Sequence, residues 1–334
     1  MNRQEVKKIK KKKKKSIFKR ILFLFFILFL AVGGYAGYVF YQTYQAANNS
    51  YDDLGRDKSK LRDEAVTISN DPVSILLLGV EDYSSGGKGG RADTLMVATF
   101  NPKDQTMKLL SLPRDTRVNI PGKESKRKIN SAYSSGGKEL TIETVEDFLD
   151  IPIDYYATVN FEGFKNIIDI VGGITVDVPF DFEQNSDDPK AELLEFKEGP
   201  MEMDGRYALA YARMRMADPN NDIGRNERQQ QVVKEVINEI VSAGTLLKVD
   251  QLTNEVGENV ETNMRMSELL GFYKKYNNFN TNKIETVKLE GVGEYVGNVA
   301  YWIPDDTSLA NIQIELKKHL ELETDNDTLS STNE

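Results

Sequence analysis

The feature that most constrains this chain is an unbroken apolar segment near its N-terminus. Residues 21–41, ILFLFFILFLAVGGYAGYVFY, contain no charged side chain. As a helix they would extend about 31 Å, which matches the hydrocarbon thickness of a bilayer. A cleaved signal peptide is the alternative, but its apolar core usually has only about 7–15 residues, and no clear small-x-small cleavage pattern follows here. The segment therefore predicts a transmembrane signal-anchor helix.

Charge is distributed unevenly around this segment. The first 20 residues hold eleven Lys or Arg and one Glu, whereas the remaining chain holds 32 basic and 51 acidic residues. By the positive-inside bias, residues 1–20 form a cytoplasmic tail of a single-pass cell-membrane protein, and everything after residue 41 lies outside the cytoplasm. Membrane topology explains the lysines, and the tail has neither interleaved aromatic residues nor a folded module. We therefore expect no nucleic-acid partner.

Two residue types restrict the chemistry of the exported part. The chain has no cysteine and a single histidine, His319. Thiol chemistry, thiolate metal sites, histidine triads and histidine-ligated zinc are excluded. An active site here has to rely on carboxylates and arginines, with or without a metal ion.

Hydrophobic patterns divide the exported part into a stalk (residues 42–70), one domain (71–320) and an acidic, disordered tail (321–334). The expected strands cover residues 73–80, 94–100, 106–112, 154–161 and 174–179, the second and third forming a hairpin. The expected helices cover residues 138–151, 162–173, 204–214, 225–242 and 266–276. Because strands and helices alternate, the chain predicts an α/β domain of α-β-α layers around a central mixed sheet. Residues 243–320 show no motif that points to a function.

Carboxylates gather at the end of the first expected strand. Glu81 and Asp82 directly follow strand 73–80, at its carboxyl end, where open α/β sheets place their ligand sites. Asp93 comes after the glycine-rich loop 83–90. This loop lacks the phosphate-loop pattern, and we interpret it as a lid or a linker. Two or three such carboxylates suit Mg²⁺, which fills its other positions with water and phosphate oxygens. The alternative is that they are turn and cap residues.

Basic side chains of the acidic exported domain lie beside apolar neighbours and at the ends of expected elements. Each one alone is most often a solvated or salt-bridged surface residue. Together they suit bidentate binding of phosphate, which matches the planar fork of arginine. The residues concerned are Arg91, Arg114, Arg117, Lys128, Arg213, Arg215, Arg225 and Arg228.

The start of the 225–242 helix is unusual because polar residues occupy its apolar stripe. The stripe runs through Val232, Val233, Val236, Ile237, Ile240 and Val241. Extended backwards at helical spacing, it passes through Arg225, Arg228 and Gln229. These side chains therefore point inward, where a helix N-terminus adds free N–H groups for an anion. The alternative is a buried salt-bridge network with nearby carboxylates, Asp218 and Asp222.

Several long motifs then occur in a distinctive order. They are ILLLGVEDY, GRADTLMVATFNPK, SLPRDTRVNIPG, KINSAYSSGG, IPIDYYATVNFEGF, DIVGGITVDVP and LAYARMRMADPNNDIGRNERQQQVV. With this order, after a basic tail and one apolar helix, the chain resembles the LytR–CpsA–Psr family of membrane-anchored cell-wall proteins of Gram-positive bacteria. The resemblance is dense over residues 73–240.

The resemblance implies a phosphotransferase. Such an enzyme takes an anionic glycopolymer, wall teichoic acid or capsular polysaccharide, from a polyprenyl-pyrophosphate carrier. It attaches the polymer to the 6-hydroxyl of muramic acid in peptidoglycan. The implied partners are thus the lipid-linked polymer, peptidoglycan and the membrane, and the lipid tail is expected in an apolar cleft.

The resemblance also implies roles for individual residues. Mg²⁺ would be held by Asp93 and by the carboxylate after the glycine–valine pair, where the family usually has Asp and this chain has Glu81 followed by Asp82. Arg114 and Arg225 would act on the reacting phosphate, and Asp93 or Asp82 would accept the proton of the sugar hydroxyl. The pyrophosphate would be surrounded by Arg91, Arg114, Arg213, Arg215, Arg225, Arg228 and Gln229, with Arg117 and Lys128 as further candidates.

Two other functions remain open from the sequence. With water as the acceptor, the same residues would make a pyrophosphatase of lipid-linked intermediates. Without turnover, they would make a polyprenyl-phosphate-binding regulator, although about twenty cytoplasmic residues are too few to fold alone and signal.

Overall fold

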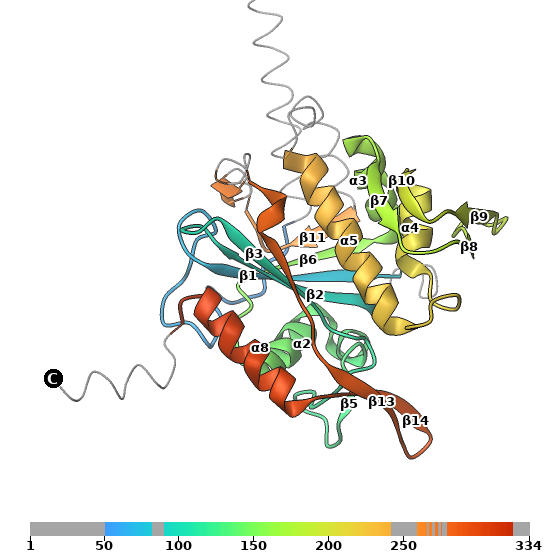
Figure 1. Cartoon of the computed structure of the whole chain (residues 1–334). Helices are drawn as coiled ribbons and strands as arrows, with labels where there is room; N and C mark the ends of the chain where they lie inside the picture. The colour runs from blue at the N-terminus through green and yellow to red at the C-terminus, as the bar shows by residue number, and fades with distance from the viewer. Residues whose placement is uncertain are drawn as a thin grey trace, which may run out of the picture. The chain divides into compact units, whose positions relative to one another are not determined.

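A six-stranded mixed sheet forms the centre of the folded part of the chain (Figure 1). The computed structural model describes residues 51–81, 90–241, 259–265, 267–268, 271–272, 275 and 279–322. The chain divides into residues 1–45 and residues 46–334, and all described residues belong to the second unit. The basic tail, the apolar segment 21–41 and Asp82 therefore lie outside the described residues. Within those ranges, no helix is both long and apolar enough to cross a bilayer.

The central sheet combines parallel and antiparallel pairs, as the predicted mixed sheet requires. In spatial order its strands are β11 (Val260–Thr262), β6 (Tyr155–Asn160), β1 (Val73–Val80), β2 (Ala92–Asn101), β3 (Thr106–Ser111) and β12 (Ile284–Val287). β1 is parallel to β6 and antiparallel to β2, and β3 is antiparallel to β2 and parallel to β12. The predicted strand 73–80 and the predicted hairpin are both confirmed.

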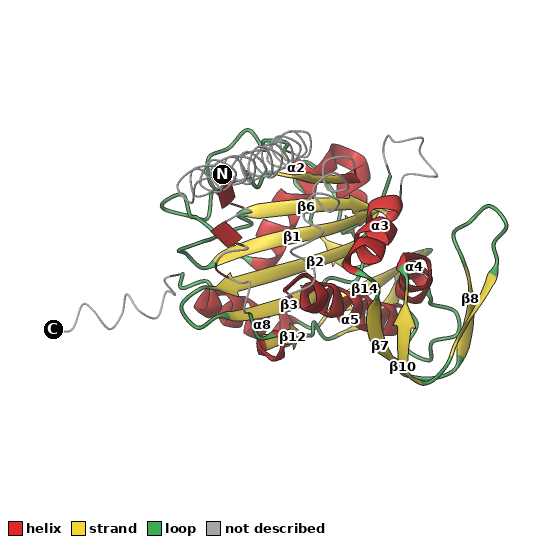
Figure 2. Cartoon of the chain, turned by 90° about the horizontal axis from the view of Figure 1, so that it is seen from above, coloured by secondary structure: helices red, strands yellow, loops and turns green. Residues whose placement is uncertain are grey.

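Helices cover both faces of this sheet (Figures 1 and 2). The helices are α2 (Ser131–Leu149), α3 (Phe161–Val171), α4 (Gly205–Arg213), α5 (Asp222–Val241) and α8 (Asp306–His319), with a 3-10 turn η2 at Thr281–Lys283. Alternate side chains of β1 enter different cores: Leu76 and Leu78 pack with α2 and α8, and Ile75 packs on the side of α5. A strand buried on both faces needs apolar residues at every position, which explains the run VSILLLGV.

A smaller lobe is built on α3, α4 and α5. Its strands are β7 (Ile174–Val178), β8 (Phe182–Asn185), β9 (Leu193–Phe196) and β10 (Gly199–Met203), and its core includes Phe182 stacked on Phe196 at 4.4 Å between ring centroids. β7 pairs with β10 and not with the central sheet. Its sequence ITVDV alternates between buried and exposed positions, as expected of a strand with one solvated face. Two short hairpins complete the fold: β4 (Arg117–Val118) with β5 (Arg127–Lys128), and β13 (Gly291–Val296) with β14 (Val299–Pro304).

The folded domain begins before residue 71, where the sequence analysis placed the end of a stalk. The Arg56 guanidinium binds both carboxylate oxygens of the buried Glu146 at 2.9 Å, and Arg62 binds both oxygens of Asp154. Ile68 is fully buried in the core on the α5 side. Residues 51–70 are polar because their contacts are ion pairs, which hydrophobic periodicity does not reveal.

The C-terminal third of the domain completes both edges of the sheet. β11 and β12 are the edge strands, and α8 covers one face. The predicted helix 266–276 lies largely outside the described residues. α2 begins at Ser131, before the predicted residue 138, and is kinked at Gly136 and Gly137.

His319 ties the end of α8 to the sheet through its ring nitrogens. Nδ1 lies 2.7 Å from the Thr99 hydroxyl, and Nε2 lies 2.9 Å from the Thr106 hydroxyl. Burial, and next the charge of Lys108, lower the pKa of His319 from 6.5 to about 4. The native protein therefore holds this imidazole neutral.

Acid is expected to weaken the fold through this histidine. Below pH 6.5 the His319 imidazole binds a proton in the unfolded chain, whereas in the native protein it binds one only at about pH 4. The free energy of unfolding should fall by up to about 3 kcal/mol over this window, at 1.36 kcal/mol per pH unit. Urea denaturation at several pH values measures this loss, and the His319→Gln variant should lack it. An equal decline in that variant between pH 6.5 and 4 would assign the loss to carboxylates instead.

Candidate active site

The carboxyl ends of β1 and β6 and the N-terminal end of β2 lie at the same end of the strands of the central sheet, which we call the strand-end edge. The register of β1 and β2 shifts there, because Val80 lies opposite Ala92 whereas Gly79 lies opposite Thr94. Asp93 is thus an extra residue without a partner on β1. A bulge of this kind bends the strand and redirects its side chain. Glu81 directly follows β1 at the same edge.

Asp93 accepts a hydrogen bond from Arg114, which lies just beyond the end of β3. The distance from Arg114 Nη1 to Asp93 Oδ1 is 2.7 Å. Burial would lower the pKa of Arg114, but the Asp93 hydrogen bond and the charges of Asp93 and Asp222 outweigh burial and raise it. The bulge and the segment after β3 therefore bring a predicted carboxylate and a predicted arginine together.

The first turn of α5 adds an arginine whose charge is poorly neutralised. Arg225 is only 5% exposed, and its Nη1 lies 3.1 Å from Asp222 Oδ1. Its Nε and Nη2 are buried and have no hydrogen-bond partner. Burial, together with the nearby charges of Arg114 and Arg215, lowers the pKa of Arg225. A buried guanidinium with two free donors is costly, so this position favours an anion.

Two arginines, one at the last position of α4 and one just after it, complete the positive cluster. Arg215 shares Asp222 with Arg225, at 3.1 Å from its Nε to Asp222 Oδ1. Arg213 lies at the last position of α4 with its guanidinium carbon 4.8 Å from the ring centroid of Phe161. We call Arg114, Arg213, Arg215 and Arg225, with Asp93 and Asp222, the arginine cluster.

Arg228 is buried as predicted, but its contacts match the salt-bridge alternative. Its Nη1 forms a short ion pair with Asp218, its Nε donates to the Tyr211 carbonyl at 3.1 Å, and its Nη2 donates to the Met214 carbonyl. All these groups are nearly inaccessible to water. Each of the three guanidinium nitrogens of Arg228 therefore has a protein partner, and the side chain joins α4 to α5.

For the remaining basic candidates, no contact with this cluster is described. Lys128 pairs with Asp115 at 2.8 Å, and the Arg117 guanidinium carbon lies 5.7 Å from the ring centroid of Tyr301. Arg91 is exposed directly before β2. Arg117 and Lys128 thus hold β4 and β5 in place, and neither has a described contact with Arg225 or Asp93.

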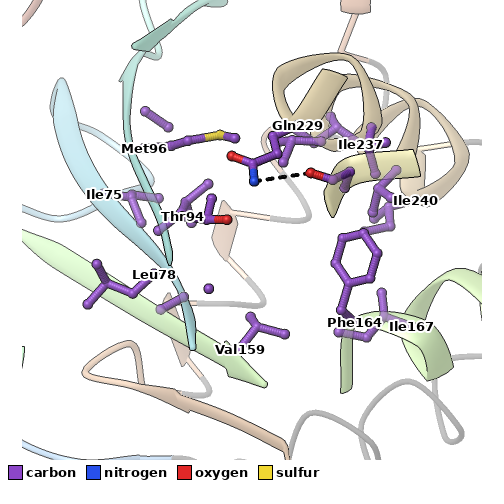
Figure 3. Close-up of a pocket in the computed structure, with 18 of the residues that line it drawn as sticks. Ile75, Leu78, Thr94, Met96, Val159, Phe164, Ile167, Gln229, Ile237 and Ile240 are labelled. Carbon is purple, nitrogen blue, oxygen red and sulfur yellow. Dashed lines mark hydrogen bonds between the residues drawn. The ribbon is translucent and has the colours of Figure 1, made fainter. Parts of the chain in front are cut away.

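An apolar cavity of about 380 Å³ lies beside the arginine cluster, between the sheet and helices α3 to α5 (Figure 3). Among its lining residues, Ile75, Met96 and Val159 come from the sheet, and Phe164 and Ile237 come from the helices. The predicted apolar stripe of α5 contributes to the hydrophobic core, where Val232 is 1% exposed, and also to the wall of this cavity. Periodicity cannot distinguish a helix face that lines a cavity from one that is fully packed.

Polar groups occur at one end of this cavity. Gln229 lines it and donates from Nε2 to the Ala212 carbonyl at 3.3 Å (Figure 3). Arg213 and Asn160 also line it. Arg213 thus lines the cavity two residues before Arg215 of the arginine cluster, an arrangement that suits a ligand with an anionic head and an apolar tail.

The donor set at the strand-end edge is compatible with Mg²⁺. Among the described residues, which exclude Asp82, no group of three or more carboxylate or histidine side chains could hold a metal ion. Glu81 and Asp93 remain as two carboxylates at one edge, and Mg²⁺ in phosphate sites uses only one or two. Water and ligand phosphate oxygens would have to supply the other positions.

Sequence comparison relates the chain to known proteins. A model of the LytR_cpsA_psr family matches residues 37–318. The polyisoprenyl-teichoic acid–peptidoglycan teichoic acid transferase TagV of Bacillus subtilis (strain 168) is 48% identical over 288 residues, which cover 85% of this chain and 74% of that protein. The transferase of the same description, TagU, from Halalkalibacterium halodurans is 42% identical and matches 83% of this chain and 89% of that protein.

Solved structures of similar proteins have the same fold as this chain. The crystal structure of B. subtilis TagV superposes with a TM-score of 0.69 at 47% identity, covering 76% of this chain and 99% of that one. A structure of TagT bound to LIIa-WTA superposes with a TM-score of 0.68 at 30% identity, covering 81% of this chain and 99% of that one.

Proposed function

The chain belongs to the LytR_cpsA_psr family, and from this premise we propose that it transfers wall teichoic acid from a polyprenyl-pyrophosphate carrier to the muramic acid 6-hydroxyl of peptidoglycan. Its relatives TagV and TagU are named as transferases of teichoic acid to peptidoglycan. The observation that carries the proposal is Arg225, a buried guanidinium with two unpartnered donors next to an apolar cavity. That combination suits a lipid pyrophosphate.

Each part of the donor has a matching surface. The pyrophosphate lies among the arginine cluster, where Arg114, Arg215 and Arg225 supply positive charge. The polyprenyl tail enters the apolar cavity past Arg213 and Gln229. Arg228 does not touch the donor; it positions the first turns of α5 through Asp218.

The reaction is a single displacement at phosphorus. The muramic acid O6 forms a bond to the phosphorus that carries the polymer, and the bond from that phosphorus to the bridging oxygen breaks. Polyprenyl phosphate leaves with the electron pair, and the O6 proton passes to a carboxylate, Asp93 or Asp82. The arginines stabilise the charge that develops on the phosphoryl and departing oxygens.

Asp93 with Glu81 or Asp82 would hold Mg²⁺ at the strand-end edge. When bound, the ion would neutralise phosphate charge and stabilise the leaving oxygen. The chain's own contribution is the bulge, which fixes the Asp93 carboxylate beside Arg114.

A membrane anchor suits this substrate. We place the chain in the cell membrane, with residues 1–20 in the cytoplasm, residues 21–41 across the bilayer and the domain outside. A polyprenyl donor is confined to the bilayer, so a tethered domain meets it at a higher effective concentration than a free one.

The test is a transfer assay with the full-length protein in detergent micelles. Mg²⁺, a short polyprenyl-pyrophosphate-linked saccharide and peptidoglycan fragments are incubated together, and mass spectrometry follows the products. A phosphodiester-linked adduct is expected. Saccharide phosphate released equally with and without acceptor would show a pyrophosphatase, and tight donor binding without turnover would show a regulator.

In this assay Asp93→Asn is expected to lower transfer by about 10²–10⁴-fold, the usual effect of losing a general base. The amide keeps the size of the side chain but loses the charge needed for a metal ion or a proton. Asp181→Asn, a change on the exposed surface of the small lobe, is the matched control. Full activity of Asp93→Asn would remove Asp93 from both the metal and the base roles.

Filling the apolar cavity is expected to weaken donor binding selectively. Ile240→Trp places extra volume where the tail lies (Figure 3). Displacing about two methylene groups of the tail raises the donor KM about tenfold, at ~0.8 kcal/mol per group. Initial rates with long-tail and short-tail donors measure this, and Ile314→Trp on the exposed side of α8 is the control. An equal effect on both donors would contradict a tail in this cavity.

A further inference from the structure

A second cavity lies on another side of α5, and nothing in the donor-binding scheme uses it. Its volume is about 80 Å³, and its walls come from the end of β3, the start of α5, the segment after β12 and β14. We propose that this cavity and its rim bind the acceptor saccharide of the transfer reaction. The inference rests on the proposed function and assigns a place to its second substrate.

α5 separates this cavity from the lipid cavity. Gln229 lines the lipid cavity, whereas the next residue, Gln230, lines the small one together with Asn226. Successive helical residues point about 100° apart, so two ligands can contact α5 on two of its faces. Asn226 directly follows Arg225, and Pro113 of the same cavity directly precedes Arg114. Two segments of the cavity wall therefore continue directly into residues of the arginine cluster.

Two residues that line the small cavity have a buried polar atom without a hydrogen-bond partner. Ser111 is 8% exposed, and its hydroxyl has no hydrogen-bond partner. The indole Nε1 of Trp302 is also buried without one. Buried donors and acceptors are nearly always paired, so these two indicate a ligand or water that bonds them.

The residue types suit a sugar. Saccharides present hydroxyl groups around the ring and C–H groups on its faces, so they are held by side-chain amides and carboxylates beside an aromatic ring. Asn226, Gln230 and Glu227 supply the polar groups, and Trp302 supplies the ring. Gly291 leaves room for that ring, because a Cβ there would lie 2.7 Å from Trp302 Nε1. An apolar tail would not need these amides.

Trp302 also provides the measurement, because it is the only tryptophan of the chain. Its emission is followed in the full-length protein in micelles while the disaccharide of N-acetylglucosamine and N-acetylmuramic acid is added without donor. We expect a saturable shift to shorter wavelength. Asn226→Ala and Gln230→Ala should each raise the Kd about tenfold, as loss of a hydrogen-bonding group to a desolvated ligand does. Ile314→Ala should leave it unchanged.

The transfer assay provides a second, independent readout. Asn226→Ala should raise the KM for the acceptor about tenfold while leaving donor binding unchanged. An unaltered acceptor KM, no emission change with the disaccharide, or a change elicited only by the donor saccharide would overturn the assignment. Failure of the proposed function looks different, because the wild-type protein itself would then form no adduct.

Discussion

Arg225→Met is expected to abolish transfer while leaving the ligand-free protein at least as stable as the wild type. Arg225 is 5% exposed with two unpartnered donors, and it shares Asp222 with Arg215, so the folded protein bears a charge that is only partly neutralised and that a bound pyrophosphate relieves. Loss of such a preorganised donor lowers kcat by about 10²–10³-fold. An apolar side chain in place of a buried ion is often neutral or stabilising by ~1–4 kcal/mol. Activity and stability should therefore change in opposite directions.

Thermal unfolding with and without inorganic pyrophosphate checks both halves of this prediction. Pyrophosphate should raise the Tm of the wild type. Without pyrophosphate, the Tm of Arg225→Met should equal or exceed that of the wild type, and adding pyrophosphate should leave it unchanged. Arg225→Lys is the matched control, because it keeps the charge but loses the planar fork, and it should recover part of the response. A variant that unfolds at lower temperature without ligand would instead make Arg225 a structural residue.

The opposite behaviour is expected at Arg228, one turn further along the same helix. Arg228→Met leaves the Asp218 carboxylate buried and unpaired, and it removes donors from the Tyr211 and Met214 carbonyls. Breaking a buried pair from one side costs about 3–5 kcal/mol. The free energy of unfolding, measured in urea, should fall by that amount. A Cβ on Gly224 would collide with the Asp218 carboxylate, so the loop has little room to rearrange.

A double variant separates the pair from its surroundings. Arg228→Met with Asp218→Leu removes both charges, and it should be more stable than Arg228→Met alone because no carboxylate remains buried without a partner. If the ion pair contributed nothing to stability, the free energy of unfolding lost by the double variant would equal the sum of the losses of the two single variants.

Arg225 and Arg228 also show how far the sequence alone leads. Helical spacing placed both side chains inside, and the structure confirms this. The sequence also offered Asp218 and Asp222 as their salt-bridge partners, and both pairs are present. Spacing alone could not decide between these pairs and an anion site, because Asp218 lies in the irregular loop between α4 and α5. Hydrophobic periodicity in the same way identified β1 and the β2–β3 hairpin. It missed residues 51–70, which are held by Arg56 and Arg62 through ion pairs to distant carboxylates.

Strand order was harder to predict than strand existence. β7 was expected from its pattern and is present, but it pairs with β10 in the small lobe. The family resemblance implied an apolar cleft, but hydrophobic periodicity could not place it, because a helix face that lines a cavity has the same spacing as one packed in a core. The carboxylates Glu81 and Asp93 were found from their position at strand ends, whereas the bulge that redirects Asp93 depends on the register with β1.

The position of α5 between two cavities has a consequence for the chemical route. A helix with a different cavity on each of two faces allows donor and acceptor to be present together. Neither has to leave before the other arrives, so the polymer needs no temporary covalent bond to the enzyme. The enzyme then works as a template that aligns two substrates, and the nucleophile is the sugar itself.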